Sequence, residues 1–367
     1  MALLKCLTVD GRGSYGIAAS AVERNERLYT YLRITDIRDD GTLNMNDLKS
    51  VDDPNASKYI LHPNDIVFAR TGASTGRNYF YDGSDGTFVY AGFLIKFSLD
   101  PQKVNPVYIK YYCQSTQYRN WIKSFSTGST RGNINAQTLG NMDIPLPSRE
   151  QQDFIVRVLS PIDEKIKLNQ KINDNLQQQT QAIYASVFVD NADPAWQQGH
   201  LSDLVTVRYG KDHKKLADGI YPVYGSGGIM RYVERPLYDK ESVLIPRKGT
   251  LNNVMYVNQP FWSVDTMFYT EMRMPNVAKF VYHFVKAKDL ASMNAGSAVP
   301  SMTTDILNAM EVAIPPASAL EEFELLVAPM YKAMQENDAQ SKILADLRDT
   351  LLPKLMSGEI DVSGINL

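Results

Sequence analysis

The sequence predicts an α+β protein in which two similar mixed α/β domains are separated and joined by two long helices. Three observations predict it. The two halves of the 367-residue chain resemble each other, each half alternates short apolar runs with turns, and each half ends in a long segment with a seven-residue apolar repeat. We expect the helices to pack as an antiparallel coiled coil within a pseudo-twofold duplication.

The duplication is visible at two places in the chain. Residues 128–147 align without a gap on residues 296–315, at an offset of 168, and residues 65–72 align on residues 242–249 at an offset of 177. The aligned pairs include Arg70 with Arg247 and Gly72 with Gly249. Because several matches occur in the same order, a repeated unit is favoured over chance.

The segment after each unit predicts a helix of roughly 40 residues, since apolar residues recur at a and d heptad positions with a polar middle. Asn169 and Asn337 occupy the same a position, and matched polar residues of this kind fix the register of a coiled coil. Pro161 and Pro329 also coincide, and we expect them to kink or interrupt the helices. Two independent long surface helices are the alternative.

The expected boundaries follow from these segments. The first globular domain should contain an amphipathic helix over 105–125, and the second a helix around 276–289. We expect a first domain over 1–148, a first helix over 149–190, a second domain over 191–316, a second helix over 317–357 and a tail over 358–367.

Composition excludes some classes of protein. The net charge of −3 argues mildly against a general nucleic-acid binder, although residues 203–250 carry nine Lys/Arg against six Asp/Glu. The four histidines and two cysteines follow no metal-binding spacing and give no disulfide framework, so we predict no metal site. The motifs G-x-x-x-x-G-K-[ST] and [DN]-P-P-[YFW] are absent, so we predict no catalytic constellation. No apolar run reaches the length of a membrane span and no export signal is evident, so we expect a cytoplasmic protein.

One motif suggests an enzyme. Gly11, Gly13 and Gly16 form G-x-G-x-x-G after an apolar run, and Asp36 follows 20 residues later, as in a dinucleotide-binding fingerprint. The chain after Asp36 is turn-rich rather than a strand–helix alternation, and the second unit lacks a glycine triplet. We therefore interpret the motif as a glycine-rich entry loop.

Other loops combine glycine with arginine and small hydroxyl residues. They are "RTGASTGR" (70–77), "STGSTRGN" (126–133), "YGSGG" (224–228) and "RKGTLNN" (247–253). Arginine binds phosphate or guanine edges with two hydrogen bonds, and hydroxyls and glycine-flanked amides bind phosphate. Their recurrence in both units favours a shared binding role over plain strand connections.

The closing stretch "LRDTLLPKLMSGEIDV" (347–362), the second-unit stretch "YPVYGSGGI…VLIPRKGTLNNVMYVNQPFWSVDTMFY" and the "IPLP"-type domain ends resemble the specificity subunits of Type I restriction–modification systems. The resemblance covers essentially the whole chain. It implies two target-recognition domains, each contacting one half of a split double-stranded DNA sequence, with the paired helices setting the unread spacer.

The same resemblance implies partners. Two modification (methyltransferase) subunits would bind S-adenosylmethionine and methylate adenine after flipping the base, and two restriction subunits would add ATP- and Mg-dependent translocation and cleavage. The chain itself would bind no cofactor, would have no catalytic role and would have no membrane partner.

The candidate DNA-contacting residues come from these loops, with Arg, Asn and Lys as base-edge readers and hydroxyls as phosphate contacts; Arg12 and Ser14 could touch the DNA backbone. The candidates are Arg33, Arg70, Thr71, Ser74, Thr75, Arg77, Thr130, Arg131 and Asn133 in the first domain, and Tyr224, Ser226, Arg247, Lys248, Thr250, Asn252 and Ser297 in the second. Two alternatives remain open: an adaptor with two protein-binding modules on a coiled-coil spacer, and a nucleotide-cofactor enzyme that uses residues 11–16.

Overall fold

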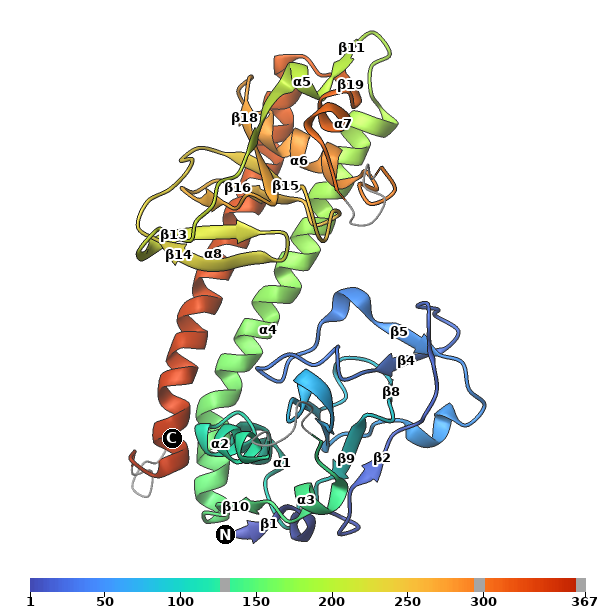
Figure 1. Cartoon of the computed structure of the whole chain (residues 1–367), viewed down its shortest axis with the longest axis vertical. Helices are drawn as coiled ribbons and strands as arrows, with labels where there is room; N and C mark the ends of the chain where they lie inside the picture. Colours follow the sequence, from blue (N-terminus) through green and yellow to red (C-terminus); the bar gives the residue numbers. More distant parts are fainter. Residues whose placement is uncertain (126–132, 294–300, 361–367) are drawn as a thin grey trace. The chain divides into compact units, whose positions relative to one another are not determined.

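A computed structural model of the chain describes residues 1–125, 133–293 and 301–360 (Figure 1). The chain divides into two compact units. Unit 1 comprises Met1–Leu168 with Gln340–Leu367, and unit 2 comprises Asn169–Ala339. The division passes through both long helices, α4 (Arg149–Ala185) and α8 (Ala317–Ser357), so each unit contains a segment of each.

Unit 1 is built on a four-stranded sheet in the order β2 (Ser14–Tyr15), β9 (Leu94–Ser98), β6 (Asp65–Ala69) and β7 (Asn78–Tyr81). A second sheet has the order β3 (Ala21–Val22), β5 (Lys49–Val51), β4 (Tyr29–Leu32) and β8 (Phe88–Tyr90). The short strands β1 (Ala2–Leu3) and β10 (Asp143–Ile144) pair with each other, and the helices are α1 (Pro106–Tyr112), α2 (Thr116–Ser124) and α3 (Ala136–Gly140).

Unit 2 repeats this arrangement. Its main sheet has the order β12 (Val205–Tyr209), β18 (Met267–Met272), β15 (Ser242–Pro246) and β16 (Met255–Val257). The second sheet consists of β14 (Gly228–Val233), β13 (Asp218–Gly225) and β17 (Trp262–Ser263). Strands β11 (Gln197–His200) and β19 (Glu311–Ile314) pair, and the helices are α5 (Leu201–Leu204), α6 (Ala278–Lys286) and α7 (Thr304–Asn308).

The main sheet of each unit is covered on both faces. Along β6, Ile66 and Phe68 join the core on the helical side, whereas Val67 and Ala69 join the core beneath the second sheet. This alternation explains why β6 reads as a continuous apolar run rather than as alternating apolar and polar residues. Strand β15 behaves in the same way, with all five residues buried.

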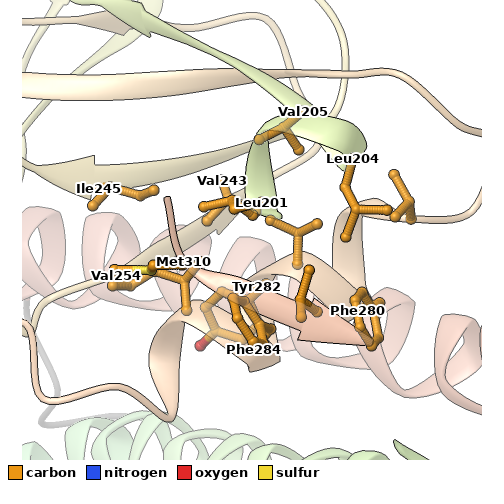
Figure 2. Close-up of a cluster of buried hydrophobic side chains, with 14 of the residues drawn as sticks. Leu201, Leu204, Val205, Val243, Ile245, Val254, Phe280, Tyr282, Phe284 and Met310 are labelled. Carbon is orange, nitrogen blue, oxygen red and sulfur yellow. The ribbon is translucent and has the colours of Figure 1, made fainter. Parts of the chain in front are cut away.

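The helical side of the unit 2 core is shown in Figure 2. Leu201 and Leu204 from α5 lie over Phe280 and Phe284 from α6, and Val243 from β15 packs into the same cluster. Both long helices complete this core. They contribute Tyr184, Leu320, Phe323 and Val327.

The long helices run antiparallel within each unit. In unit 2, Asn169 Nδ2 donates to the Asn337 carbonyl oxygen at 3.3 Å, and Asn173 Nδ2 donates to the Met334 carbonyl oxygen at 3.2 Å, so the residue numbers run in opposite directions. Asn337 Nδ2 also donates to Asn173 Oδ1 at 2.8 Å. The two asparagines predicted to match are therefore adjacent, and their role in fixing the register stays a prediction.

Two details of the predicted helices differ. Neither long helix is interrupted at its proline, because the rest of each helix is held by packing on both units, and a kink at these prolines stays a prediction. The predicted helix over 105–125 is split into α1 and α2. Ser115 begins the second helix, because its hydroxyl accepts a hydrogen bond from the Tyr118 amide at 3.2 Å and satisfies the helix N-terminus.

A partly buried polar cluster joins α1 to both long helices in unit 1. Asp163 from α4 forms ion pairs with Lys110 at 2.7 Å and with Arg348 from α8 at 3.1 Å, and it accepts a hydrogen bond from the Tyr111 hydroxyl at 3.0 Å. Burial alone would raise the pKa of Asp163, but the two cations outweigh it and hold that pKa below its ordinary value.

The corresponding cluster in unit 2 is neutral. The buried His283 ring lies 2.9 Å from Gln181 Oε1 through Nδ1 and 2.9 Å from the Tyr331 hydroxyl through Nε2. Because a carboxamide oxygen only accepts, Nδ1 carries the hydrogen and Nε2 accepts from Tyr331. Burial lowers the pKa of His283 to about 4.

We expect this histidine to make unit 2 sensitive to acid. Its folded-state pKa of about 4 lies below the ordinary 6.5, so the unfolded chain binds the proton more readily between these values. The free energy of unfolding should therefore fall by about 3 kcal/mol as the pH drops from 6.5 to 4. Urea unfolding followed by circular dichroism across this range should show a shallower pH dependence for His283→Gln than for the wild type.

The exposed His62 in unit 1 provides the control. His62→Gln should keep the wild-type pH dependence. Parallel pH profiles for the wild type and His283→Gln would contradict this prediction.

Candidate nucleic-acid interface

Arg70 and Arg247 occupy equivalent backbone positions in the two units. Arg70 follows β6, its amide donates to the Phe93 carbonyl oxygen at 3.0 Å, and its carbonyl oxygen accepts from the Ile134 amide at 2.9 Å. Arg247 follows β15, and the corresponding bonds go to Thr266 at 2.9 Å and Met302 at 2.9 Å. The sheet order and these four hydrogen bonds give both arginines the same local frame.

Both guanidinium groups lie over exposed aromatic rings. The Arg70 guanidinium carbon is 5.2 Å from the centre of the Tyr15 ring and 5.8 Å from that of Phe93. The Arg247 guanidinium carbon is 5.6 Å from the centre of the Tyr209 ring. Tyr15 is 44% exposed and Tyr209 is 52% exposed, so each pair is open to solvent. A cation within about 6 Å of a ring face is attracted to it by about 0.5–1 kcal/mol at an exposed site.

Neither arginine forms an ion pair with any carboxylate in the described ranges 1–125, 133–293 and 301–360. Two other candidate arginines differ in this respect. Arg33 pairs with Asp36 at 2.6 Å, and Arg77 donates to Asp39 through Nε at 2.7 Å. The Arg33 and Arg77 guanidinium groups are thus used in holding loops of unit 1.

The glycine motif at the start of the chain has a packing role. A Cβ atom on Gly16 would lie 2.3 Å from the carbonyl oxygens of Tyr90 and Ala91, and one on Gly210 would lie 2.0 Å from the Val264 carbonyl oxygen. These distances are shorter than real Cβ contacts, so both positions require glycine. Gly16 and Gly210 end equivalent strands and directly follow the tyrosines of the two Arg–Tyr pairs.

The remaining unit 1 candidates lie around the turn after β6. Thr71 forms an antiparallel bridge with the exposed Asn133, Ser74 is buried, and the Thr75 hydroxyl donates to the Gly72 carbonyl oxygen at 2.8 Å. Thr130 and Arg131 lie outside the described residues. Of this group, Asn133 has an exposed side chain beside Arg70.

In unit 2 the candidates divide by exposure. Lys248 and Thr250 are exposed beside Arg247, and Lys248 bridges to Ser301 as Thr71 bridges to Asn133. Asn252 is exposed but donates to Asp289 Oδ1 at 3.0 Å.

Two further candidates of unit 2 are held by neighbouring side chains. Tyr224 is buried, its hydroxyl accepts from Gln259, and burial raises its pKa. The Ser226 carbonyl oxygen accepts from Asn253 at 2.7 Å. Ser297 lies outside the described residues. The structure therefore brings Arg247, Lys248 and Thr250 together but leaves the Tyr224 ring in the core.

The aromatic residues Tyr15, Phe93 and Tyr209 are not among the residues that the sequence predicts for the interface. A signal was present for two of them, because the dipeptide Tyr-Gly ends the corresponding strand in each unit, at Tyr15-Gly16 and Tyr209-Gly210. The dipeptide is too short to stand out without the sheet pairing that aligns the strands.

Over the part of the chain that the structure describes, no group of three or more His, Cys, Asp and Glu side chains is arranged to hold a metal ion. In the same ranges no helix is both long enough and apolar enough to cross a membrane.

We expect the packing role of the two glycines to be measurable. Gly16→Ala or Gly210→Ala forces a methyl group against backbone carbonyls and should lower the free energy of unfolding by about 1–3 kcal/mol, the usual cost of overpacking. Gly227→Ala is the matched control, because a Cβ there meets nothing within 4 Å. Thermal unfolding of the four proteins would measure this, and an unchanged Gly210→Ala protein would contradict the packing role.

Comparison with known proteins gives two matches within the chain to one family model. The Type I restriction modification DNA specificity domain matches residues 19–178 and again residues 194–347. The specificity subunit of the Type I restriction enzyme MjaIX from Methanocaldococcus jannaschii is 24% identical over 299 residues, covering 70% of this chain and 69% of its own length. The HindI specificity subunit from Haemophilus influenzae is 19% identical over 420 residues, covering 84% and 89%.

A solved structure has a similar fold. The S subunit of a Type I restriction-modification system from M. genitalium aligns over 96% of this chain and 95% of its own, with a TM-score of 0.59 and 19% sequence identity.

Proposed function

The chain belongs to the family of Type I restriction modification DNA specificity domains and contains two copies of that domain, and from this premise we propose that it reads a DNA target in two parts. Each domain would contact one half-site of a double-stranded target. The observation that carries the proposal is the double match to the family model. Each structural unit also contains one Arg–Tyr pair at the end of an equivalent strand.

The exposed groups beside each pair are the proposed DNA-contacting surface. They are Asn133 in the first copy and Lys248 and Thr250 in the second, with the partly exposed Thr71 closer to the strand end. Side chains of these types bind base edges and phosphates. Arg33, Arg77 and Asn252 are engaged by carboxylates, so we assign them to holding the loops rather than to reading bases.

The remaining parts of the proposal concern organisation. The target-recognition domains would comprise residues 1–148 and 191–316, and the helices over 149–190 and 317–357 would set the spacer between half-sites, followed by the tail over 358–367. The chain would act in the cytoplasm without catalytic groups or a cofactor of its own. Two modification subunits would methylate adenine with S-adenosylmethionine, and two restriction subunits would cleave with ATP and Mg.

Methylome sequencing tests the function directly. A host carrying this gene together with its modification partner should show adenine methylation in a split motif, and deletion of the gene should abolish that motif because the partner loses its sequence reader. An inactive-partner strain is the control for methylation by other enzymes. A methylome that is identical with and without the gene would refute the proposal.

Lengthening the helices tests their role as a ruler. A heptad inserted between Glu164 and Lys165 and another between Lys342 and Ile343, positions that lie opposite each other in unit 1, add about 10 Å at ~1.5 Å per residue. Since base pairs stack about 3.4 Å apart, the unread spacer should grow by about 3 base pairs while both half-sites stay the same.

Insertion into α4 alone is the control, because it breaks the pairing of the helices and should abolish methylation. An unchanged spacer in the double insertion would exclude the ruler.

A further inference from the structure

The Arg–Tyr pair is the same in both units, whereas the residues around it differ between the units. Arg70 with Tyr15 and Arg247 with Tyr209 occupy the same places in two units whose neighbouring side chains differ. Phe93 in unit 1 corresponds to Thr266 in unit 2, as shown by the hydrogen bonds from the two arginine amides. Likewise the bridge of Thr71 and Asn133 corresponds to that of Lys248 and Ser301.

This distribution bears on what the arginines contact. The two half-sites of a split target differ in sequence, but any two segments of duplex DNA share the phosphate backbone. A group that is identical in both units is suited to the shared feature, and groups that differ between the units are suited to the bases. We propose that Arg70 and Arg247 are phosphate anchors, each binding a phosphodiester group of one half-site; this rests on the proposed function and replaces the base-edge role suggested by the sequence.

The local chemistry fits a phosphodiester. A guanidinium lying over a ring has one face covered, while N–H groups in its plane match two phosphate oxygens. The Arg70 Nε–H donates to the Gly92 carbonyl oxygen at 3.4 Å, so its terminal N–H groups would be the ones that bind the phosphate. Lacking a carboxylate partner among the described residues, each arginine keeps its positive charge available to an anion. The ring limits the positions of a long side chain, so less conformational entropy is lost when the anion binds.

The tyrosines are positioning residues in this scheme. The Tyr15 hydroxyl accepts a hydrogen bond from the Ala136 amide at 3.2 Å, which fixes its ring from the start of α3. The Tyr209 ring packs edge-on against the buried Phe268, with ring centres 5.0 Å apart. Gly16 and Gly210 draw each strand end close to the neighbouring backbone and thereby place the two rings.

The salt dependence of DNA binding tests the anchors. Binding of the full chain to a random-sequence duplex and to a duplex with its split target is measured from about 50 to 200 mM KCl. Each phosphate contact contributes about −0.9 to the slope of log K against log salt concentration. Arg70→Ala and Arg247→Ala should each make the slope about 0.9 less negative, the double variant about 1.8, with both duplexes weakened by the same factor.

Matched variants distinguish the loss of a specific phosphate contact from a general loss of positive charge. Arg119→Gln on α2 and Arg235→Gln after β14 remove exposed arginines outside the pairs and should leave the slope unchanged. Arg247→Lys keeps the charge and should keep the slope. Tyr209→Leu should lower affinity toward that of Arg247→Ala, whereas Tyr209→Phe should bind as the wild type does.

The outcomes are distinct. If Arg70→Ala or Arg247→Ala relaxes recognition of one half-site while the slope stays unchanged, the arginines read bases, and the anchor proposal is overturned while the proposed function stands. If slope and affinity are both unchanged, the pairs lie outside the interface. If the wild type binds neither duplex and its methylome shows no split motif, the proposed function itself fails.

Discussion

The structure depends on one constraint: the core of each globular unit is completed by segments of both long helices. Phe154, Ile155 and Leu159 of α4 and Leu352 and Leu355 of α8 close the core of unit 1, although almost 200 residues separate the two sets. In unit 2 the same helices contribute Tyr184 at the end of α4 and Leu320 and Phe323 near the start of α8, and Phe188 joins this core from the π-helical turn Ser186–Asp190 directly after α4. Neither unit can therefore bury its apolar sheet face without the helix that the other half of the sequence provides. This shared burial explains why α4 and α8 run unbroken past a proline, since packing outweighs local helix propensity.

The duplicated units have kept the position of one polar cluster beside the long helices but differ in its side chains. Asp163 and Tyr331 are separated by the repeat offset of 168, and each contacts the helix that follows the main sheet of its unit. Asp163 accepts from Tyr111 of α1, whereas Tyr331 donates to His283 of α6. In unit 1 the cluster is ionic, with Lys110 and Arg348 around the carboxylate. In unit 2 it consists of neutral His283, Gln181 and Tyr331. Charged groups away from solvent need charged partners, and the unit 1 carboxylate has two. Buried neutral polar groups need hydrogen bonds, and both ring nitrogens of the unit 2 histidine have one. The two units thus have the same fold, and we expect them to respond differently to pH.

The sequence predicted those features that depend on local periodicity. Heptads over 149–190 and 317–357 located both long helices, and the aligned ends of the repeats indicated two related units before any fold was known. The predicted helix boundaries were wrong where a single side chain sets the start of a helix. Ser115 begins a new helix inside an apolar pattern that looks continuous.

The sequence also does not predict the aromatic partner of Arg70. Tyr15 lies 55 residues earlier, and the two meet only because β9 pairs with both β2 and β6, which is information about sheet order rather than about spacing.

The same reasoning explains why the glycine fingerprint does not mark a cofactor site and why the Tyr-Gly dipeptide alone does not mark the arginine site. G-x-G-x-x-G is informative only where a strand leads into a helix whose N-terminus faces a phosphate. Here Gly16 directly follows the short strand β2, and the Tyr90 and Ala91 carbonyl oxygens occupy the space that a side chain would need. These oxygens are hydrogen-bond acceptors and would repel an anion. Gly210 meets the Val264 carbonyl in the same way. In both units the position that requires glycine directly follows the tyrosine on whose ring the arginine lies. The close backbone packing at the glycine and the placement of the proposed phosphate contact therefore depend on the same strand end.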